Sequence, residues 1–398
     1  MKKKHLIHIC FLLPFVLTTF NVQVFITTLV SDVLAQLMAY GNLGLIFLGM
    51  ALIIKDRGPL SPTAKLWIIF YFLYFIFAIT ASAIHNNPAN ILVAVIPLIY
   101  VLGFYLYLSQ PENRQAFKYV ALTAFVLSCI LSIYLYNIQF SLDKGGPDIY
   151  MDRSNGVYAD ANNTALAAII SFIFLFKVYK PTQRVFKLFK ILLLLIVFYG
   201  LFITFSNTGF MVFIISLVML NHRFFNGLRL IIGLALLPVI YITLANLNTI
   251  TADMNLVGQQ RDKINNIVNI VTFNTDKVDD SGRNYLVTKL IKNYVYKNPF
   301  IGNGVDFAIS QHAHNTLVGV WADAGIFVVL FFLFMLLRYF IQAMRSPPDT
   351  RYFAIPILLT MCIFMLSLQS VINQPYLMAL FIYLGYVLDE TETDLISK

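Results

Sequence analysis

The chain has 398 residues and a formal net charge of +9; 59% of its residues are hydrophobic and only 12% are charged. Its mean hydropathy of +0.77 is far above what a soluble domain carries without aggregating. Apolar runs of about 18 residues or more are typical of transmembrane helices, and these runs lack the alternation of barrel strands. The composition therefore excludes a soluble enzyme and predicts an all-α, polytopic membrane protein.

The apolar runs predict about twelve transmembrane helices. The first begins "MKKKHLIHICFLLPFVL", which resembles a signal peptide but has no obvious small-residue cleavage site, so we expect an uncleaved first span. In chain order the expected spans cover 6–29, 33–54, 65–84, 89–108, 116–137, 162–179, 188–204, 208–221, 228–247, 314–338, 352–370 and 374–389.

The distribution of Lys and Arg among the short loops predicts the orientation. One side holds 19 of the 28 basic residues, and seven of the other nine lie in a single long loop. Because cytoplasmic loops carry the excess of basic residues, we expect both termini in the cytoplasm. The net positive charge thus reports topology, and no nucleic acid partner is expected.

Two outer segments are long enough for polar chemistry, and they define three expected regions. Residues 1–247 hold spans one to nine and the outer loop 138–161. Residues 248–313 form a periplasmic, helical loop domain. Residues 314–398 hold spans ten to twelve.

The second outer segment contains an amphipathic helix that begins near Arg283. Its apolar positions repeat at helical spacing, as expected for a helix on the membrane surface. Arg283 stands in the first turn, where the helix dipole disfavours a cation but where helix N-termini bind anions. This position indicates either a phosphate-binding site or an ion pair with Asp279 or Asp280.

The sequence "HAHN" follows this segment at the start of the tenth span. A neutral imidazole exchanges a proton near pH 7, so His314 is a candidate general base, with His312 beside it. Asn315 could orient the imidazole or bind a sugar hydroxyl. The alternative is an interfacial histidine that stabilises a helix end.

Two further polar stretches precede the sixth and eighth spans. In "YMDRSNGVYADANNTA", Arg153 is a candidate second cationic contact, or the stretch is an ordinary loop with a helix cap at Asn162 or Asn163. In "TFSNTGF", Asn207 lies in a turn between two short spans. Polar backbone at membrane depth is tolerated where it lines protein or a wet cavity, so this turn either faces a pocket or is a plain outer turn.

Several of these residues together resemble the core of the O-antigen ligase and polymerase superfamily. That family has an Arg that opens a periplasmic helix, then "NP-x-x-G-x-G", "H-x-H-N-x-x-L" and "G-I". "DRSNGVYADANNTA" is similar to its "R-x-x-G-x-x-x-x-N". The matching core residues here are Arg283, Asn298, Pro299, Gly302, Gly304, His312, His314, Asn315, Leu317, Gly325 and Ile326. One departure is Asn207, which stands where the family's "S-R-x-G/A" turn has its arginine.

The resemblance implies a GT-C-like membrane glycosyltransferase of the bacterial inner membrane with its active face in the periplasm. Its donor would be an undecaprenyl-diphosphate-linked glycan and its acceptor a lipid A-core or other glycan, with no metal or cofactor. His314 would activate the acceptor hydroxyl, and Arg283 and Arg153 would bind the diphosphate. His312, Asn315, Lys289 and Asn207 would contact substrate, and membrane lipids would surround the spans.

Three other functions remain open at this point. A polymerase of the same family would use the same donor and add repeat units to a growing chain. A transporter would carry charges inside its spans, but here the polar groups collect on one outer face. An inactive family member is the third alternative, which the replacement of the arginine by Asn207 keeps open.

Overall fold

The computed structural model describes residues 3–87, 91–148, 151–222, 238–239, 241–254, 256–277, 283–312, 314–369 and 371–396. Within these ranges the chain is almost entirely helical, and its one sheet is an antiparallel pair of two-residue strands, β1 (Phe140–Ser141) and β2 (Gly146–Pro147). The predicted all-α class is therefore confirmed. The expected ninth span, 228–247, lies largely outside the described residues.

Five described helices are long and apolar enough to cross a membrane: α3 with its 3₁₀ extension η1 (Asp32–Asp56), α4 (Pro62–Ile84), α7 (Pro111–Asn137), α9 (Arg184–Phe202) and α17 (Ile326–Arg345). The pair α1 (Lys3–Thr19) and α2 (Val22–Leu29) makes a sixth if it counts as one span. Shorter apolar helices are α6 (Ile96–Tyr107), α8 (Ala161–Lys177) and α10 (Asn207–Leu220). The count of twelve spans stays a prediction.

The remaining elements complete the bundle and cover its end opposite the two termini. α5 (Ile91–Ala94) precedes α6, and α18 (Pro348–Met365), η6 (Val371–Asn373) and α19 (Pro375–Ile396) end the chain. The segments 138–161 and 248–313 contain η2 (Gly156–Tyr158), most of α12 (Leu247–Ile250), α13 (Gly258–Val271), η4 (Thr275–Lys277), α14 (Arg283–Leu290), the π-helical turn η5 (Ile291–Val295) and α15 (Phe307–Ser310). Helix α16 (Thr316–Ala324) follows them.

Two expected spans are broken in the structure. The first bends by 59° between α1 and α2, where Asn21 adopts a left-handed φ of 51°. The tenth, expected as one helix over 314–338, divides at Gly325, whose φ of 83° separates α16 from α17. A left-handed residue ends helical hydrogen bonding, and apolar periodicity continues through such a break, so the apolar pattern alone did not reveal it.

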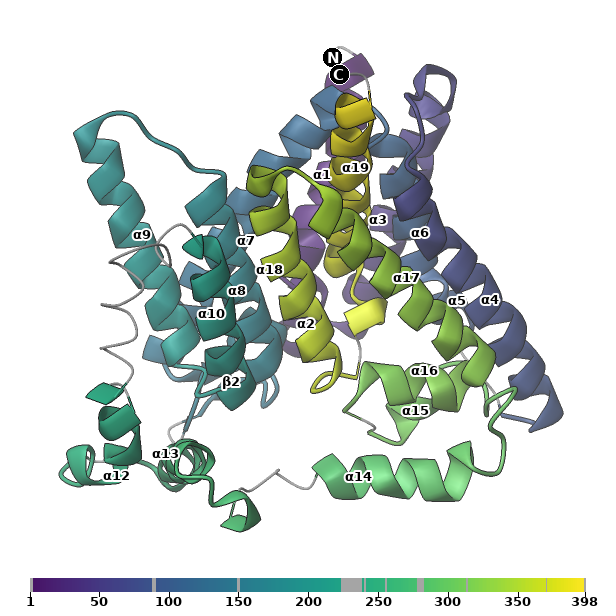
Figure 1. Ribbon diagram of the computed structural model, residues 1–398. Coiled ribbons are helices and arrows are strands. Elements are labelled where there is room, and N and C mark those ends of the chain that lie inside the picture. The colour runs from purple at the N-terminus through teal and green to yellow at the C-terminus, as the bar shows by residue number, and fades with distance from the viewer. Residues whose placement is uncertain are drawn as a thin grey trace.

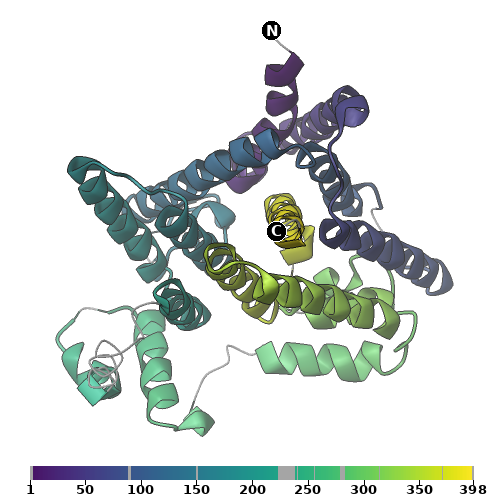
Figure 2. The same ribbon diagram turned by 45° about the horizontal axis from the view of Figure 1, so that its top comes forward.

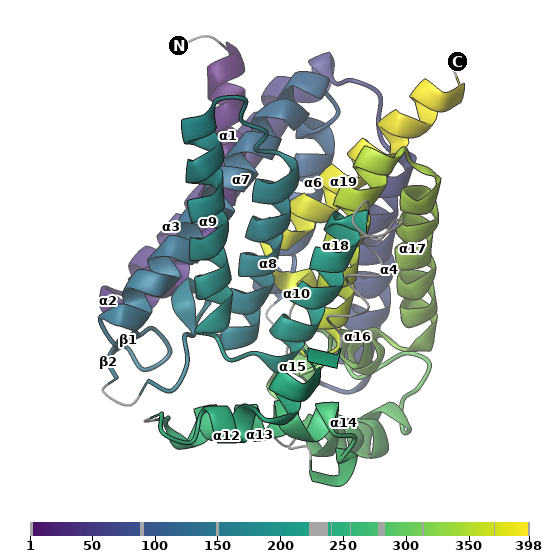
Figure 3. The same ribbon diagram turned by 60° about the vertical axis from the view of Figure 1, so that its left-hand side comes forward.

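α19 lies in the middle of a ring formed by the other helices (Figure 2). It packs against α1, α4, α6, α17 and α18, and its residues from Leu377 to Leu384 are at most 3% exposed. α9, by contrast, exposes Leu188, Ile191 and Leu195, as expected of a lipid-facing helix. Both chain ends lie at one end of the bundle, and α12, α13 and α14 cross its opposite end (Figures 1 and 3).

Asp389 of α19 ties this central helix to the start of α4. Its carboxylate accepts hydrogen bonds from the Ser61 hydroxyl and from the Thr63 backbone N–H and hydroxyl, the last two at 3.0 and 2.6 Å.

We expect Asp389→Ala to lower the free energy of unfolding by about 2–3 kcal/mol, because hydrogen bonds to a charged group are lost at a helix start. Unfolding in mixed micelles of increasing SDS content measures this. Glu112→Ala, which removes an exposed ion pair with Lys4, is the control and should change little; equal effects would contradict the assignment.

Candidate functional site

The turn that carries the two histidines has an unusual backbone. His312 and His314 have φ values of 52° and 45°, and Asp306, shortly before them, has 54°. Non-glycine residues in this left-handed region are uncommon and cluster at functional sites, where the surrounding structure holds them in place. His312 is exposed and His314 is half-buried.

The connection between α18 and α19 holds this turn in place. The Gln369 side chain accepts from the His314 backbone N–H at 3.5 Å and donates to the Ala308 carbonyl at 2.8 Å. The buried Thr316 hydroxyl donates to the Leu368 carbonyl at 2.6 Å. Asn315 caps α16, since its side-chain oxygen accepts from the Val318 N–H at 3.0 Å. That oxygen therefore stabilises the helix start, and the amide nitrogen of Asn315 remains for the expected contact with an imidazole or a sugar.

The helix that Arg283 opens packs on the same block. Leu290 and Val295, at the ends of α14 and η5, form a small buried cluster with Ala308 of α15 and Ala322 of α16. Figure 1 shows α14 running beneath α15 and α16. The backbone of Arg283 is the first residue of α14, but its side chain lies outside the described part of the chain, as do residues 278–282, including Asp279 and Asp280. Lys289 is exposed.

The segment "NPFIGNG" packs its backbone closely against the break between α16 and α17. A Cβ at Gly302 would meet the Asp323 carbonyl oxygen at 2.4 Å, and one at Gly325 would meet the Phe300 carbonyl oxygen at 2.0 Å. Both glycines have positive φ, so only glycine fits this approach of two backbones. Asn303, 5% exposed, adds two hydrogen bonds to the Ala322 carbonyl. The motif thus joins the loop to the break between α16 and α17.

The carboxyl groups of Asp323 and Asp306 lie in the same block as the histidine turn. Asp323, which is 6% exposed, accepts from the Tyr74 hydroxyl at 2.8 Å and from the Ala308 N–H at 2.7 Å. Asp306 accepts from the Asn373 side chain at 3.4 Å. Burial raises the pKa of Asp306, and the hydrogen bond from Asn373 partly offsets that rise.

We expect Asp306→Asn to remove part of the pH dependence of stability. Because the folded chain binds this proton more tightly than the unfolded chain, the stabilisation is complete below the ordinary aspartate pKa and is lost as pH rises through the raised one. Asparagine stays neutral, tolerates the left-handed backbone and keeps an acceptor for Asn373. Melting temperatures between pH 4 and 9 should therefore converge at acid pH, with the variant higher at alkaline pH. Asp276→Asn, on the exposed turn η4, is the control; parallel wild-type and Asp306→Asn curves would refute the expectation.

Arg153 and Asn207 belong to a second cluster, around the start of α8. The residues on either side of Arg153 are anchored: the Asp152 carbonyl accepts from the Gln260 side chain of α13 at 2.6 Å, and the Ser154 N–H donates to Ile203 at 2.8 Å. Ser206 caps α10 and donates to the Asn162 side chain at 2.8 Å. The side-chain oxygen of Asn207 is buried with no hydrogen-bond partner among the described residues.

The described contacts therefore divide the predicted site residues into two groups. One holds Arg283, Lys289, His312, His314 and Asn315, on α14 and at the start of α16; the other holds Arg153 and Asn207.

The groups are connected by a segment that the sequence analysis did not select, "SLQSVINQP". Gln369 reaches the histidine turn and Asn373 reaches Asp306. Gln374 donates to the Asn163 side chain of α8 at 3.0 Å. The sequence did contain a sign of this role, because three amide side chains stand close together in a short link between two apolar helices.

No protein-family model and no curated protein matches this chain.

Proposed function

We propose that this chain is a membrane glycosyltransferase of the O-antigen ligase type. In this proposal it moves a glycan from an undecaprenyl diphosphate carrier to an acceptor sugar, such as a lipid A-core, at the periplasmic face of a bacterial inner membrane. The apolar helices support a membrane protein. The segments that carry the predicted site residues lie toward one end of the bundle, opposite the two termini (Figure 1), and this arrangement supports chemistry at a surface over transport through the membrane.

The observation that carries the proposal is the histidine turn. His314 has a left-handed backbone and its N–H contacts Gln369, in a block that packs against the helix opened by Arg283. An imidazole near neutral pH is a suitable base for an acceptor hydroxyl. An arginine at a helix start suits a diphosphate leaving group, because the guanidinium stays charged and binds two oxygens at once.

The remaining predicted residues take supporting positions in the proposal. Lys289, exposed on α14, adds positive charge near the leaving group. Arg153 and Asn207 contribute from the α8 cluster, and His312 and Asn315 flank the base. The exposed apolar face of α9 suits membrane lipid and a prenyl chain. The proposed glycan transfer requires no metal or cofactor.

A polymerase is the second candidate, because it would use the same donor and the same base and differ only in its acceptor. An inactive protein or a transporter is the third, and the uncharged Asn207 favours the inactive reading.

A gel profile of surface glycan separates these functions. The source strain without this gene is complemented with the wild-type gene or with a His314→Ala variant. Long glycan that accumulates on the carrier and never reaches the acceptor identifies a ligase. An acceptor that carries only single units identifies a polymerase. An unchanged profile would reject both enzymes and favour the third candidate.

A further inference from the structure

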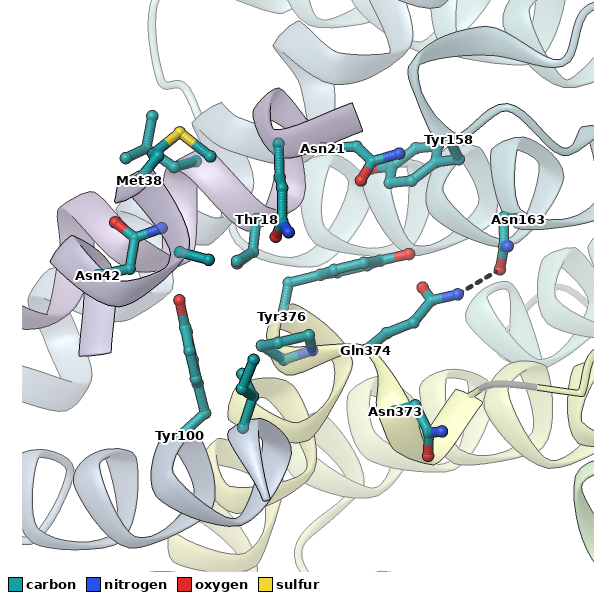
Figure 4. A pocket seen from close by; sticks show the side chains of 15 residues that line it. Thr18, Asn21, Met38, Asn42, Tyr100, Tyr158, Asn163, Asn373, Gln374 and Tyr376 are labelled. Carbon is teal, nitrogen blue, oxygen red and sulfur yellow. Dashed lines mark hydrogen bonds between the residues drawn. The ribbon is translucent and has the colours of Figure 1, made fainter. Parts of the chain in front are cut away.

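A cavity of ≈ 200 Å³ lies between the first helix pair and the start of α19. α1, α2, α3, α6, α8 and the η6–α19 connection all contribute to its wall (Figure 4). Since a water molecule occupies about 30 Å³ in the liquid, the space holds several waters or one small organic molecule. Neither Arg153 nor His314 is among its lining residues.

The lining of this cavity is polar but uncharged. Of its 15 described lining residues none is Asp, Glu, Lys, Arg or His. Six carry amides and three are tyrosines; with Thr18 the polar members are Asn21, Gln23, Asn42, Asn163, Asn373, Gln374, Tyr100, Tyr158 and Tyr376. A phosphate, a carboxylate or an ammonium group would enter such a site without a counter-charge, which is costly.

Tyr376, which lines the cavity, has a hydroxyl group that forms no hydrogen bond with the described residues. Its ring is 3% exposed. Tyr158 and Tyr100, which are also buried, line the same space, with ring contacts between Tyr158 and Tyr376. A buried hydroxyl without a partner costs free energy, and a hydrogen bond from a molecule bound in the adjoining cavity would recover that cost.

The break between α1 and α2 in the first span lies at the wall of this cavity. Asn21, left-handed at the α1–α2 break, donates to the Val157 carbonyl at 3.0 Å and lines the cavity. Asn42, 5% exposed, lies within the apolar span α3 and lines it as well. Interrupted helices and amides at membrane depth are tolerated where they line a polar cavity, and such breaks mark binding sites in other membrane proteins.

We propose that this cavity binds the ring of an uncharged sugar. Amides and phenol hydroxyls both donate and accept hydrogen bonds, so they match the hydroxyls of a sugar. Aromatic rings cover its apolar C–H face. The cavity takes one ring, because of its volume, and selects against charged sugars, because of its lining. This site is separate from the diphosphate chemistry proposed above and does not depend on it.

Binding is measured on the full chain in phosphocholine nanodiscs, which avoid detergents with sugar headgroups. Saturation-transfer NMR with methyl glucoside, methyl galactoside and N-acetylglucosamine is compared with glucuronic acid and glucose 6-phosphate, whose C–H protons can also be observed. We expect transfer to at least one neutral sugar and none to the two anions. No transfer to any neutral sugar, or equal transfer to glucuronic acid, would overturn the proposal.

Tyr376→Phe tests the unpartnered hydroxyl directly. Because that hydroxyl has no partner in the described protein, its removal should leave the melting temperature of the empty chain unchanged or higher. It should weaken sugar binding roughly threefold to tenfold, as expected for one hydrogen bond. Tyr339→Phe is the matched control: that buried hydroxyl donates to the Phe381 carbonyl, outside the cavity, so its loss should lower stability and leave binding unchanged. Unaltered binding in Tyr376→Phe would overturn the assignment of this hydroxyl.

The sugar-binding and transfer proposals fail separately. Binding with no effect of the gene on surface glycan retains the cavity assignment and rejects the transferase. If loss of the gene alters surface glycan but the protein binds no neutral sugar, the transferase is retained and the cavity assignment is rejected.

Discussion

Replacing His314 by alanine is expected to abolish glycan transfer while the protein still inserts and expresses. Loss of a general base lowers a rate by roughly 10²–10⁴-fold, and His312 is the other imidazole on the same turn. The measurement is the surface-glycan profile of the complemented strain, together with turnover of purified carrier-linked donor. A second variant, His314→Asn, keeps a side chain that tolerates the left-handed φ of 45°, so its inactivity would trace to chemistry and not to backbone strain.

His312→Ala is the matched control for this prediction. It lies two residues away, is exposed, and has the same left-handed backbone, with a φ of 52°. We expect it to retain most of the activity, since it supports the site and does not take the proton. Normal transfer by both His314 variants would remove the proposed mechanism. Equal loss in His312→Ala and His314→Ala would indicate that the turn matters for its shape.

Arg283→Lys is expected to reduce transfer severely, by roughly 10- to 100-fold. Lysine keeps the charge but loses the planar fork that binds two phosphate oxygens, and hydrogen bonds between charged groups contribute about 1.5–3 kcal/mol. The change should appear in turnover of the carrier-linked donor, with normal amounts of protein in the membrane.

Arg261→Lys supplies the comparison for that experiment. Arg261 is exposed on α13, another helix of the outer segment, and we expect its exchange to leave transfer unchanged. Full activity of Arg283→Lys would identify Arg283 as a structural residue. Loss in both variants would point to the charge of the outer segment as a whole.

The sequence predicted most of the helices because a lipid-facing or buried apolar helix leaves a long, uninterrupted run of residues. α4, α7 and α9 lie close to where the expected spans 65–84, 116–137 and 188–204 placed them. The breaks at Asn21 and Gly325 were missed, since one left-handed residue does not interrupt an apolar run. The same limit applies to η5, where a π-helical turn replaces regular α-helix inside a continuous amphipathic pattern.

The candidate site was predictable only where its residues are close in sequence. The histidine turn, its glycines and the start of α14 lie within a single segment, and the structure packs them into one block. Gln369, Asn373 and Gln374 were missed because their role comes from contacts with residues far away in the chain. The cavity was missed for the same reason: its wall combines Thr18, Tyr100 and Tyr376, which no local pattern relates.

The central position of α19 has a consequence for how the protein is made. A ribosome releases α19 after every helix that surrounds it, so the ring enters the membrane before its core is present. The early helices can already pack on one another through contacts such as α1 with α3 and α3 with α6, but the faces of α1, α4 and α6 that contact α19 stay uncovered until α19 arrives. Assembly of the bundle is thus completed only once α19 has been made, and a nascent chain arrested before α19 should be recognised by membrane proteases as unassembled.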